Sequence, residues 1–173
     1  MTAKTTKLPE KLTDYFSKEE NVEGFKKGLE DLLLKLRDYL TKIDKVNDFN
    51  AALDIVENII NIIDVYDDCP RELLSIILLT NILPIPPYVK YILELVLKFE
   101  PGAVEEIKEV IKIMKKTETK SKEENLTSYE KLTTVISIVS ASLGKETEEF
   151  KNKIGNYVLN ISKAVNKFIK RAK

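Results

Sequence analysis

The C-terminal segment holds the set of polar residues that is most suggestive of a binding function. Eight cations surround the apolar seam of the last predicted helix: Lys145, Lys151, Lys153, Lys163, Lys167, Lys170, Arg171 and Lys173. A basic amphipathic helix of this kind suits an anionic membrane, a phosphate backbone or the groove of a protein partner. The candidates for contact with nucleic acid or another anionic surface are the last five: Lys163, Lys167, Lys170, Arg171 and Lys173.

Ordinary bundle packing is the alternative interpretation of this segment. Every helix of a water-facing bundle is amphipathic, and lysine is common throughout the chain. The tyrosine and phenylalanine residues of the segment follow its apolar seam instead of alternating with the lysines. That placement disfavours a platform on which nucleic-acid bases stack.

Several routes to catalysis are closed by composition, because the chain contains no histidine, no tryptophan and no glutamine. Without histidine there is no Ser-His or Cys-His pair and no imidazole metal ligand. The five glycines, at positions 24, 28, 102, 144 and 155, form neither a P-loop nor a dinucleotide-binding fingerprint. The sequence therefore predicts a protein that is not an enzyme, with no catalytic residues, no cofactor and no metal.

One acidic cluster and the single cysteine are the residues that come closest to a metal-binding or catalytic role. Asp64, Asp67, Asp68 and Glu72 could converge on a hard cation, but the ligand spacing and glycine of a calcium loop are missing. Helix capping explains them better. Carboxylates close to it in the sequence would raise the pKa of the Cys69 thiol and disfavour its reactive anion, so we expect an inert cysteine.

Charge is balanced overall but segregated along the chain. There are 28 basic and 28 acidic residues, and the net charge is +1 for residues 1–46, −6 for 47–100, zero for 101–125 and +5 for 126–173. We expect a protein partner or a homo-oligomer, with nucleic acid as a second candidate and a membrane as the weakest. A lone cysteine and a polar N-terminus favour a reducing, cytoplasmic location. Abundant Lys and Glu without Gln or His are compatible with a heat-adapted proteome, although asparagine is plentiful.

These residues must be positioned by helices, because no segment alternates as a half-buried strand does. Residues 1–16 are expected to form a flexible arm, and residues 17–173 a helical bundle domain. Ser17 and Glu20 have capping-box spacing ahead of a helix whose apolar residues continue to Ile43. A second helix, from about residue 48 to 66, is apolar around most of its circumference and should lie at the centre.

Residues 73–89 form an uncharged run of seventeen residues that approaches the length of a membrane span. Pro84, Pro86 and Pro87 interrupt it, because proline lacks a backbone donor and clashes with the preceding turn. Two buried helices are therefore predicted, over residues 71–83 and 86–100. A membrane-surface role for this region or for the last helix stays open as an alternative function.

The remaining capping residues, glycines and apolar stripes predict three further helices and one loop. A short helix should end near Lys116, and a polar loop should follow at residues 117–125 because that segment has no apolar residue. Thr127 and Glu130 form a second capping box, and Gly144 ends that helix. A last helix then carries a seam from Phe150 to Phe168.

The predicted fold class is all-α, a single compact bundle of six or seven helices. The function expected first is a non-catalytic accessory or adaptor protein that acts through protein–protein contacts or self-association. The alternative is a small helical subunit of a nucleoprotein complex, which would bind the phosphate backbone through the lysine-rich C-terminal helix.

Overall fold

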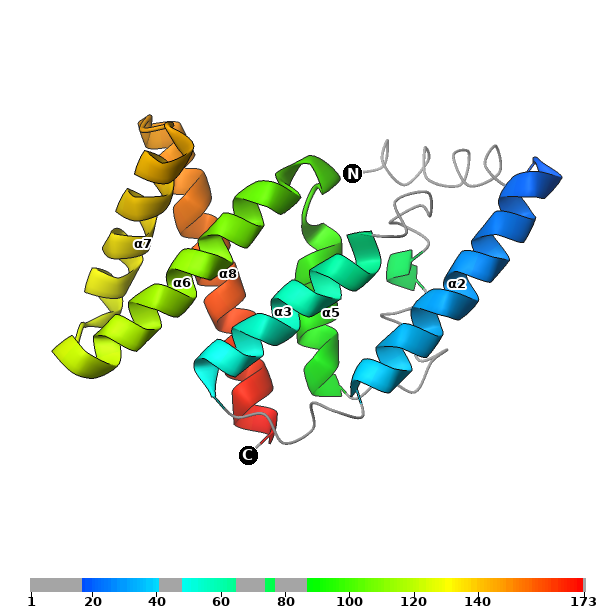
Figure 1. The fold of residues 1–173 in the computed structure, drawn as a ribbon, viewed down its shortest axis with the longest axis horizontal. Coiled ribbons are helices and arrows are strands. Elements are labelled where there is room, and N and C mark those ends of the chain that lie inside the picture. Colours follow the sequence, from blue (N-terminus) through cyan, green and yellow to red (C-terminus); the bar gives the residue numbers. More distant parts are fainter. Residues whose placement is uncertain (1–16, 41–47, 65–73, 77–86, 173) are drawn as a thin grey trace.

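The chain folds as an all-α bundle, as predicted (Figure 1). The computed structural model describes residues 17–40, 48–64, 74–76 and 87–172, and it contains no strand in those ranges. The expected N-terminal arm, the acidic cluster beyond Asp64, Cys69 and the proline-rich bend before Pro87 lie outside the described residues. The elements are α2 (Glu19–Leu40), α3 (Phe49–Asp64), α5 (Pro87–Lys98), the 3₁₀ turn η1 (Pro101–Ala103), α6 (Val104–Glu124), α7 (Ser128–Leu143) and α8 (Glu148–Ala172).

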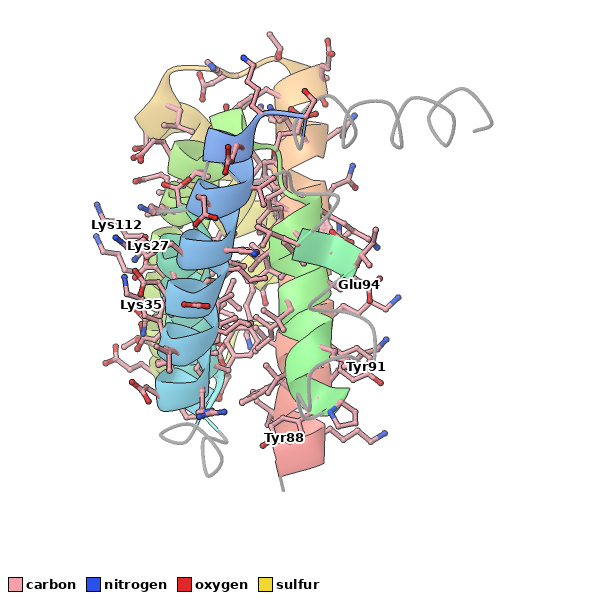
Figure 2. The ribbon with its side chains drawn as sticks, turned by 90° about the vertical axis from the view of Figure 1, so that its right-hand side faces the viewer. Lys27, Lys35, Tyr88, Tyr91, Glu94 and Lys112 are labelled. Carbon is pink, nitrogen blue, oxygen red and sulfur yellow. The ribbon has the colours of Figure 1, made fainter. Side chains whose placement is uncertain are left out.

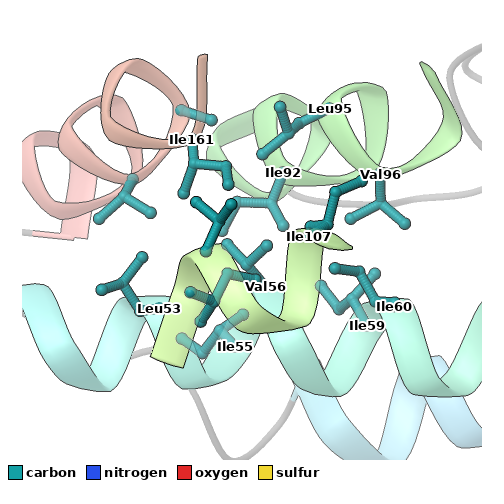
Figure 3. Packing of buried hydrophobic residues seen from close by; sticks show 14 of the residues in the cluster. Leu53, Ile55, Val56, Ile59, Ile60, Ile92, Leu95, Val96, Ile107 and Ile161 are labelled. Carbon is teal, nitrogen blue, oxygen red and sulfur yellow. The ribbon is translucent and has the colours of Figure 1, made fainter. Parts of the chain in front are cut away.

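Helix α3 lies at the centre of the described bundle, where its composition placed it. It runs between α2 and α6, and its apolar face meets α5 and α8 (Figure 1). Figure 3 shows the convergence of buried side chains from four helices: Leu53, Val56 and Ile60 of α3, Ile92 and Val96 of α5, Ile107 of α6, and Ile161 of α8. Removal of this apolar surface from water is the main force that holds the helices together.

The polar residues of α3 form ion pairs and hydrogen bonds with the neighbouring helices. Lys115 of α6 forms ion pairs with Asp54 and Glu57, and its backbone carbonyl accepts a hydrogen bond from Asn50 Nδ2 at 3.2 Å. Burial alone would lower the pKa of Lys115, but the two carboxylates outweigh it and raise that pKa above its ordinary value. On the other side of α3, Asn58 Nδ2 donates to the Tyr39 hydroxyl of α2 at 3.0 Å.

The predicted polar loop at residues 117–125 is wrong, because α6 continues through Glu124. Two of its small polar residues, Thr117 and Ser121, face the interior and are buried. Two of its charged residues form ion pairs with other segments, Glu118 with Lys131 at 3.1 Å and Lys122 with Asp48 at 3.4 Å. The helix ends where Asn125 adopts a left-handed conformation, with φ of 55°.

The second capping box is confirmed in both of its hydrogen bonds. The backbone N–H of Glu130 donates to Thr127 Oγ1 at 3.1 Å, and the backbone N–H of Thr127 donates to Glu130 Oε1 at 2.9 Å. Gly144 ends α7 in the left-handed region, with φ of 68°, as its position predicts. These local signals fix where α7 begins and ends.

Asp48 gives the central helix a pH-dependent cap. Its carboxylate accepts a hydrogen bond from the Ala51 backbone N–H at 3.1 Å, and this bond, with Lys122 nearby, lowers the pKa of Asp48 below its ordinary value of 3.8. A lowered pKa in the folded state means that the stabilisation is present above the unfolded-state pKa and is lost as the pH falls through the folded-state pKa. We therefore expect acid to weaken this cap only below about pH 4.

The change Asp48→Asn tests this expectation, because asparagine caps helices about as well as aspartate but does not titrate. Urea unfolding should give a larger free energy for the wild type at about pH 6, and the difference between the two proteins should shrink as the pH falls below about 4. Equal slopes of stability against pH across this interval would contradict the role given to this carboxylate.

Ser140 of α7 is fully buried, and its Oγ has no hydrogen-bond partner in the described part of the structure. A buried polar group without a partner costs about 1–3 kcal/mol, and alanine also favours the helix slightly more than serine. Ser140→Ala should therefore raise the free energy of unfolding by about 1 kcal/mol.

Ser142, two residues further along α7, provides the matched control. It is exposed, and its Oγ donates to Glu109 Oε1 of α6 at 3.1 Å, so Ser142→Ala removes a hydrogen bond that is made. Thermal unfolding should show a higher Tm for Ser140→Ala and no rise for Ser142→Ala. A lower Tm for Ser140→Ala would show that its hydroxyl is satisfied in solution.

Candidate functional site

Helix α8 divides its residues between the core and the surface in the way that its seam predicted. Ile154, Ile161, Val165 and Phe168 are buried, while Lys163, Lys167 and Lys170 are exposed. Three of the five predicted contact residues can thus be placed on the surface. Arg171 lies in the last turn of α8 but only its backbone is described, and Lys173 lies outside the described residues.

The three placed lysines form one row, which we call the lysine ladder: Lys163, Lys167 and Lys170. Their spacing of four and three residues puts them on one face of the helix. From Phe150 to its end, α8 contains no acidic residue. In the part of the chain that the structure describes, no ladder residue forms an ion pair. By contrast, Lys145 just before α8 and Lys153 within it both pair with Glu106, at 3.7 and 3.0 Å.

Interactions within α8 itself do not stabilise the lysine ladder. Like charges four residues apart repel by a few tenths of a kcal/mol per pair. The negative end of the helix dipole offsets this only within the last turn, which contains Lys170 but not Lys163 or Lys167. Among the described residues, no carboxylate neutralises the charge at these two positions.

A hollow of about 340 Å³ runs beside the ladder, between α5 and α8. Its rim is polar and comes from both helices: Tyr91, Glu94 and Lys98 of α5, and Asn160, Lys163 and Lys167 of α8. Its floor is apolar and includes Leu95 and Ala164. Figure 2 shows Tyr91 and Glu94 on the outer side of α5, whereas Lys27, Lys35 and Lys112 lie on the opposite side of the molecule. We call the hollow and the lysine ladder together the α5–α8 face.

The aromatic ring that accompanies the ladder comes from another helix. The Lys167 ammonium lies 4.8 Å from the centre of the Tyr91 ring, and the Tyr91 side chain is 42% exposed. Two further lysines lie near rings of α8 itself, Lys145 beside Phe150 at 5.4 Å and Lys153 beside Tyr157 at 5.9 Å. The expectation from the sequence concerned the aromatic residues of α8 alone, and Tyr91 of α5 adds a ring beside the lysines that this expectation did not include.

Tyr91, Glu94 and Lys98 were not among the residues predicted from the sequence. In the sequence, these three residues form a polar stripe, at intervals of three and four, on an otherwise apolar segment. That stripe shows that one side of α5 faces water, but it does not show that α8 lies next to it. The site therefore depends on a long-range contact.

The titratable groups near the start of α8 are not poised for proton transfer at neutral pH. The hydrogen bond with Glu106 raises the pKa of Lys153, and burial raises the pKa of Tyr157. Both shifts move these groups further from neutrality, so Lys153 stays charged and Tyr157 stays protonated. The role of Lys153 at this position is to brace α8 against α6.

Metal-binding groups and membrane spans are both missing from the described residues. These residues contain no group of three or more acidic or cysteine side chains that could hold a metal ion. Within the same residues, every helix is too short or too polar to cross a lipid bilayer. The acidic cluster considered above lies beyond Asp64, outside the described part.

A second hollow, of about 470 Å³, lies on a different side of α8, between α6 and α7. Its lining is largely apolar and includes Met114, Leu132 and Leu159. The charged residues in it, Glu118 and Lys131, neutralise each other at 3.1 Å. In contrast to the α5–α8 face, this hollow presents no unpaired charge among its described residues.

No protein-family model, no curated protein and no solved structure matches this chain.

Proposed function

We propose that this protein is a non-catalytic adaptor that binds an acidic segment of a partner protein on its α5–α8 face. The observation that carries the proposal is the lysine ladder: three exposed cations in register, without ion pairs among the described residues, on a helix that lacks acidic residues beyond Glu149. Complementary charge steers association and selects partners. The apolar floor beside the ladder supplies surface that a partner side chain can bury.

A second copy of this chain is a poorer occupant than a different protein. The acidic segment of residues 47–100 is the natural counterpart of the ladder, but four of its described carboxylates are already engaged. Asp48 pairs with Lys122, Asp54 and Glu57 pair with Lys115, and Glu94 pairs with Lys98. Head-to-tail pairing would have to break these contacts.

A phosphate backbone is also disfavoured on this face. Glu94 lines the same hollow as Lys163 and Lys167, so the charge of this face is mixed and is not the uniformly basic stripe that a phosphate backbone favours. The apolar floor adds nothing to contacts with a sugar–phosphate chain. These features support a protein partner over the nucleoprotein and membrane-surface alternatives.

Fluorescence anisotropy with defined probes tests the proposal. The probes are a labelled amphipathic peptide of about 20 residues rich in glutamate, its lysine counterpart, a single-stranded oligonucleotide of about the same length, and vesicles of phosphatidylcholine with phosphatidylserine. The full chain should bind the glutamate peptide in the micromolar range, more weakly as salt rises, and should not bind the lysine peptide. Absence of binding to the glutamate peptide, or tighter binding to the oligonucleotide or vesicles, would contradict the proposal.

Paired substitutions locate the binding on the molecule. Lys163→Gln together with Lys167→Gln should weaken binding of the glutamate peptide about tenfold, because two charges without ion pairs among the described residues are lost. The control is Lys112→Gln with Lys116→Gln, which has the same spacing and charge change on exposed positions of α6. The control should bind as the wild type does, and both variants should keep the wild-type Tm. Equal weakening of binding by the two variants would show that only net charge matters and would contradict the assignment of peptide binding to the α5–α8 face.

A further inference from the structure

The shape of the α5–α8 hollow carries information beyond its charge. Helices α5 and α8 run antiparallel, because Tyr88 near the start of α5 meets Phe168 near the end of α8, and Phe99 meets Tyr157. The Phe99–Tyr157 pair, with ring centres 6.0 Å apart, lines one end of the hollow, and the Tyr88–Phe168 pair, 5.3 Å apart, lies beyond its other end. Between them the floor is formed by Leu95 and the small side chain of Ala164. The hollow is therefore a trough that follows the helix axes.

The length of the trough matches about two turns of helix. Tyr91 and Lys98 on one rim, and Asn160 and Lys167 on the other, are each separated by two helical turns, which corresponds to roughly 10 Å. A trough between two antiparallel helices accepts a third helix through the same packing of ridges into grooves that holds helices together. Addition of a partner strand has no template here, because the described residues contain no sheet edge.

The ladder has a helical repeat that an incoming chain must match. Lys163, Lys167 and Lys170 rise along the axis by about 6 and then about 4.5 Å. A helix lying along the trough presents carboxylates at the same heights when they are four and three residues apart. An extended chain, at about 3.3 Å per residue, would need spacings of about two and one, and it would turn alternate side chains away.

The two rims differ in net charge, positive on α8 and neutral on α5, which gives the incoming helix a defined rotation. The α8 rim is positive, whereas the α5 rim carries Glu94, paired with Lys98 at 3.0 Å. The half-exposed Tyr91 ring on the α5 rim offers apolar surface, and the largely buried Leu95 side chain forms part of the floor beside it. The complementary helix therefore has an acidic stripe, an adjacent apolar stripe, and no acidic residue on the side that meets α5.

We infer that the partner segment is an amphipathic α-helix of about two or three turns, with carboxylates spaced four and three residues apart opposite the lysine ladder. An apolar side chain of this helix enters the trough between Tyr91 and Ala164. The inference rests on the proposed function and adds the conformation and register of the ligand.

Three peptides of identical composition test the inference against the full-length chain. The first carries glutamates spaced four and three residues apart beside a stripe of leucine and tryptophan. The second has the same residues rearranged so that the glutamates surround the helix. The third has its proline moved from the end to the centre, where it breaks the helix. The first should bind at least about tenfold more tightly than the other two, and its circular dichroism should show helix formation on binding.

Variants of exposed tyrosines provide the structural control. Tyr91→Ala should weaken binding of the first peptide about fivefold and leave binding of the second unchanged, because only a helix in register reaches this ring. Tyr129→Ala removes an accessible tyrosine from α7 and should change neither. Both positions are exposed, so both variants should remain folded.

The outcomes separate the two proposals. Equal affinity for all three peptides would overturn the helical register and leave the binding of acidic segments standing. Failure of every peptide to bind, or preference for an oligonucleotide of equal charge or for anionic vesicles, would overturn both. Tighter binding of the peptide with the central proline would indicate an extended ligand and contradict the inference.

Discussion

Replacement of Phe168 by alanine is expected to lower the free energy of unfolding by about 3–5 kcal/mol. The Phe168 side chain is completely buried, although it lies only a few residues from the end of α8. It packs against the Tyr88 ring, with ring centres 5.3 Å apart, and so joins the end of α8 to the start of α5. Removal of the ring loses its transfer free energy and leaves a cavity between the two helices.

Urea unfolding at neutral pH, followed by circular dichroism, measures this effect. Tyr91→Ala is the matched control, because it removes an aromatic ring from the same interface at an exposed position and should cost less than about 1 kcal/mol. A loss of less than about 1 kcal/mol for Phe168→Ala would mean that the end of α8 does not pack on α5. The lysine ladder would then have no fixed place beside the trough.

The second large effect is expected from reversal of charge on the ladder. Lys163→Glu, Lys167→Glu and Lys170→Glu together should weaken binding of the glutamate peptide at least about 100-fold, because three attractions become three repulsions. The same variant should gain affinity for the lysine counterpart of that peptide. Its stability should fall by no more than about 1 kcal/mol, mainly because a carboxylate in place of the Lys170 ammonium would oppose the negative end of the helix dipole.

Three exposed lysines on other helices supply the control for net charge. Lys27→Glu, Lys112→Glu and Lys116→Glu change the total charge by the same amount, and Figure 2 shows Lys27 and Lys112 on the side opposite to Tyr91. Anisotropy titrations at low salt should show less than about a threefold change for this variant. A comparable loss in both triple variants would mean that the α5–α8 face has no special role.

Helix positions that depend on neighbouring residues were predictable from the sequence. Thr127 and Glu130 make both bonds of their capping box, and Gly144 adopts the left-handed conformation that its place after an apolar run requires. The central position of α3 followed from its nearly continuous apolar surface. Each of these features is decided within about one or two helical turns.

The end of α6 was not predictable in this way. Residues 117–124 lack apolar side chains, so nothing in their own pattern indicates a buried face. They are helical because other elements complete them: Asn50 of α3 donates to Thr119 Oγ1 at 3.2 Å, and Lys131 of α7 pairs with Glu118. Tertiary contacts here override the local preference for a loop.

The candidate site was predictable only in part, for the same reason. Lys163, Lys167 and Lys170 could be named because their spacing on one helix is local information. Tyr91 and Glu94 could not, because they come from a helix much earlier in the chain and reach the ladder only through packing of α5 on α8. Spacing along one helix does not give distances across a bundle.

Mapping the bound peptide by amide NMR tests the central claim most directly. When the glutamate peptide with four- and three-residue spacing is added to the ¹⁵N-labelled full chain, shift changes should gather in residues 88–99 and 157–170, with α7 unchanged. Changes that instead gather at the hollow between α6, α7 and α8, or that spread evenly over every exposed lysine, would contradict the assignment of the α5–α8 face as the docking surface.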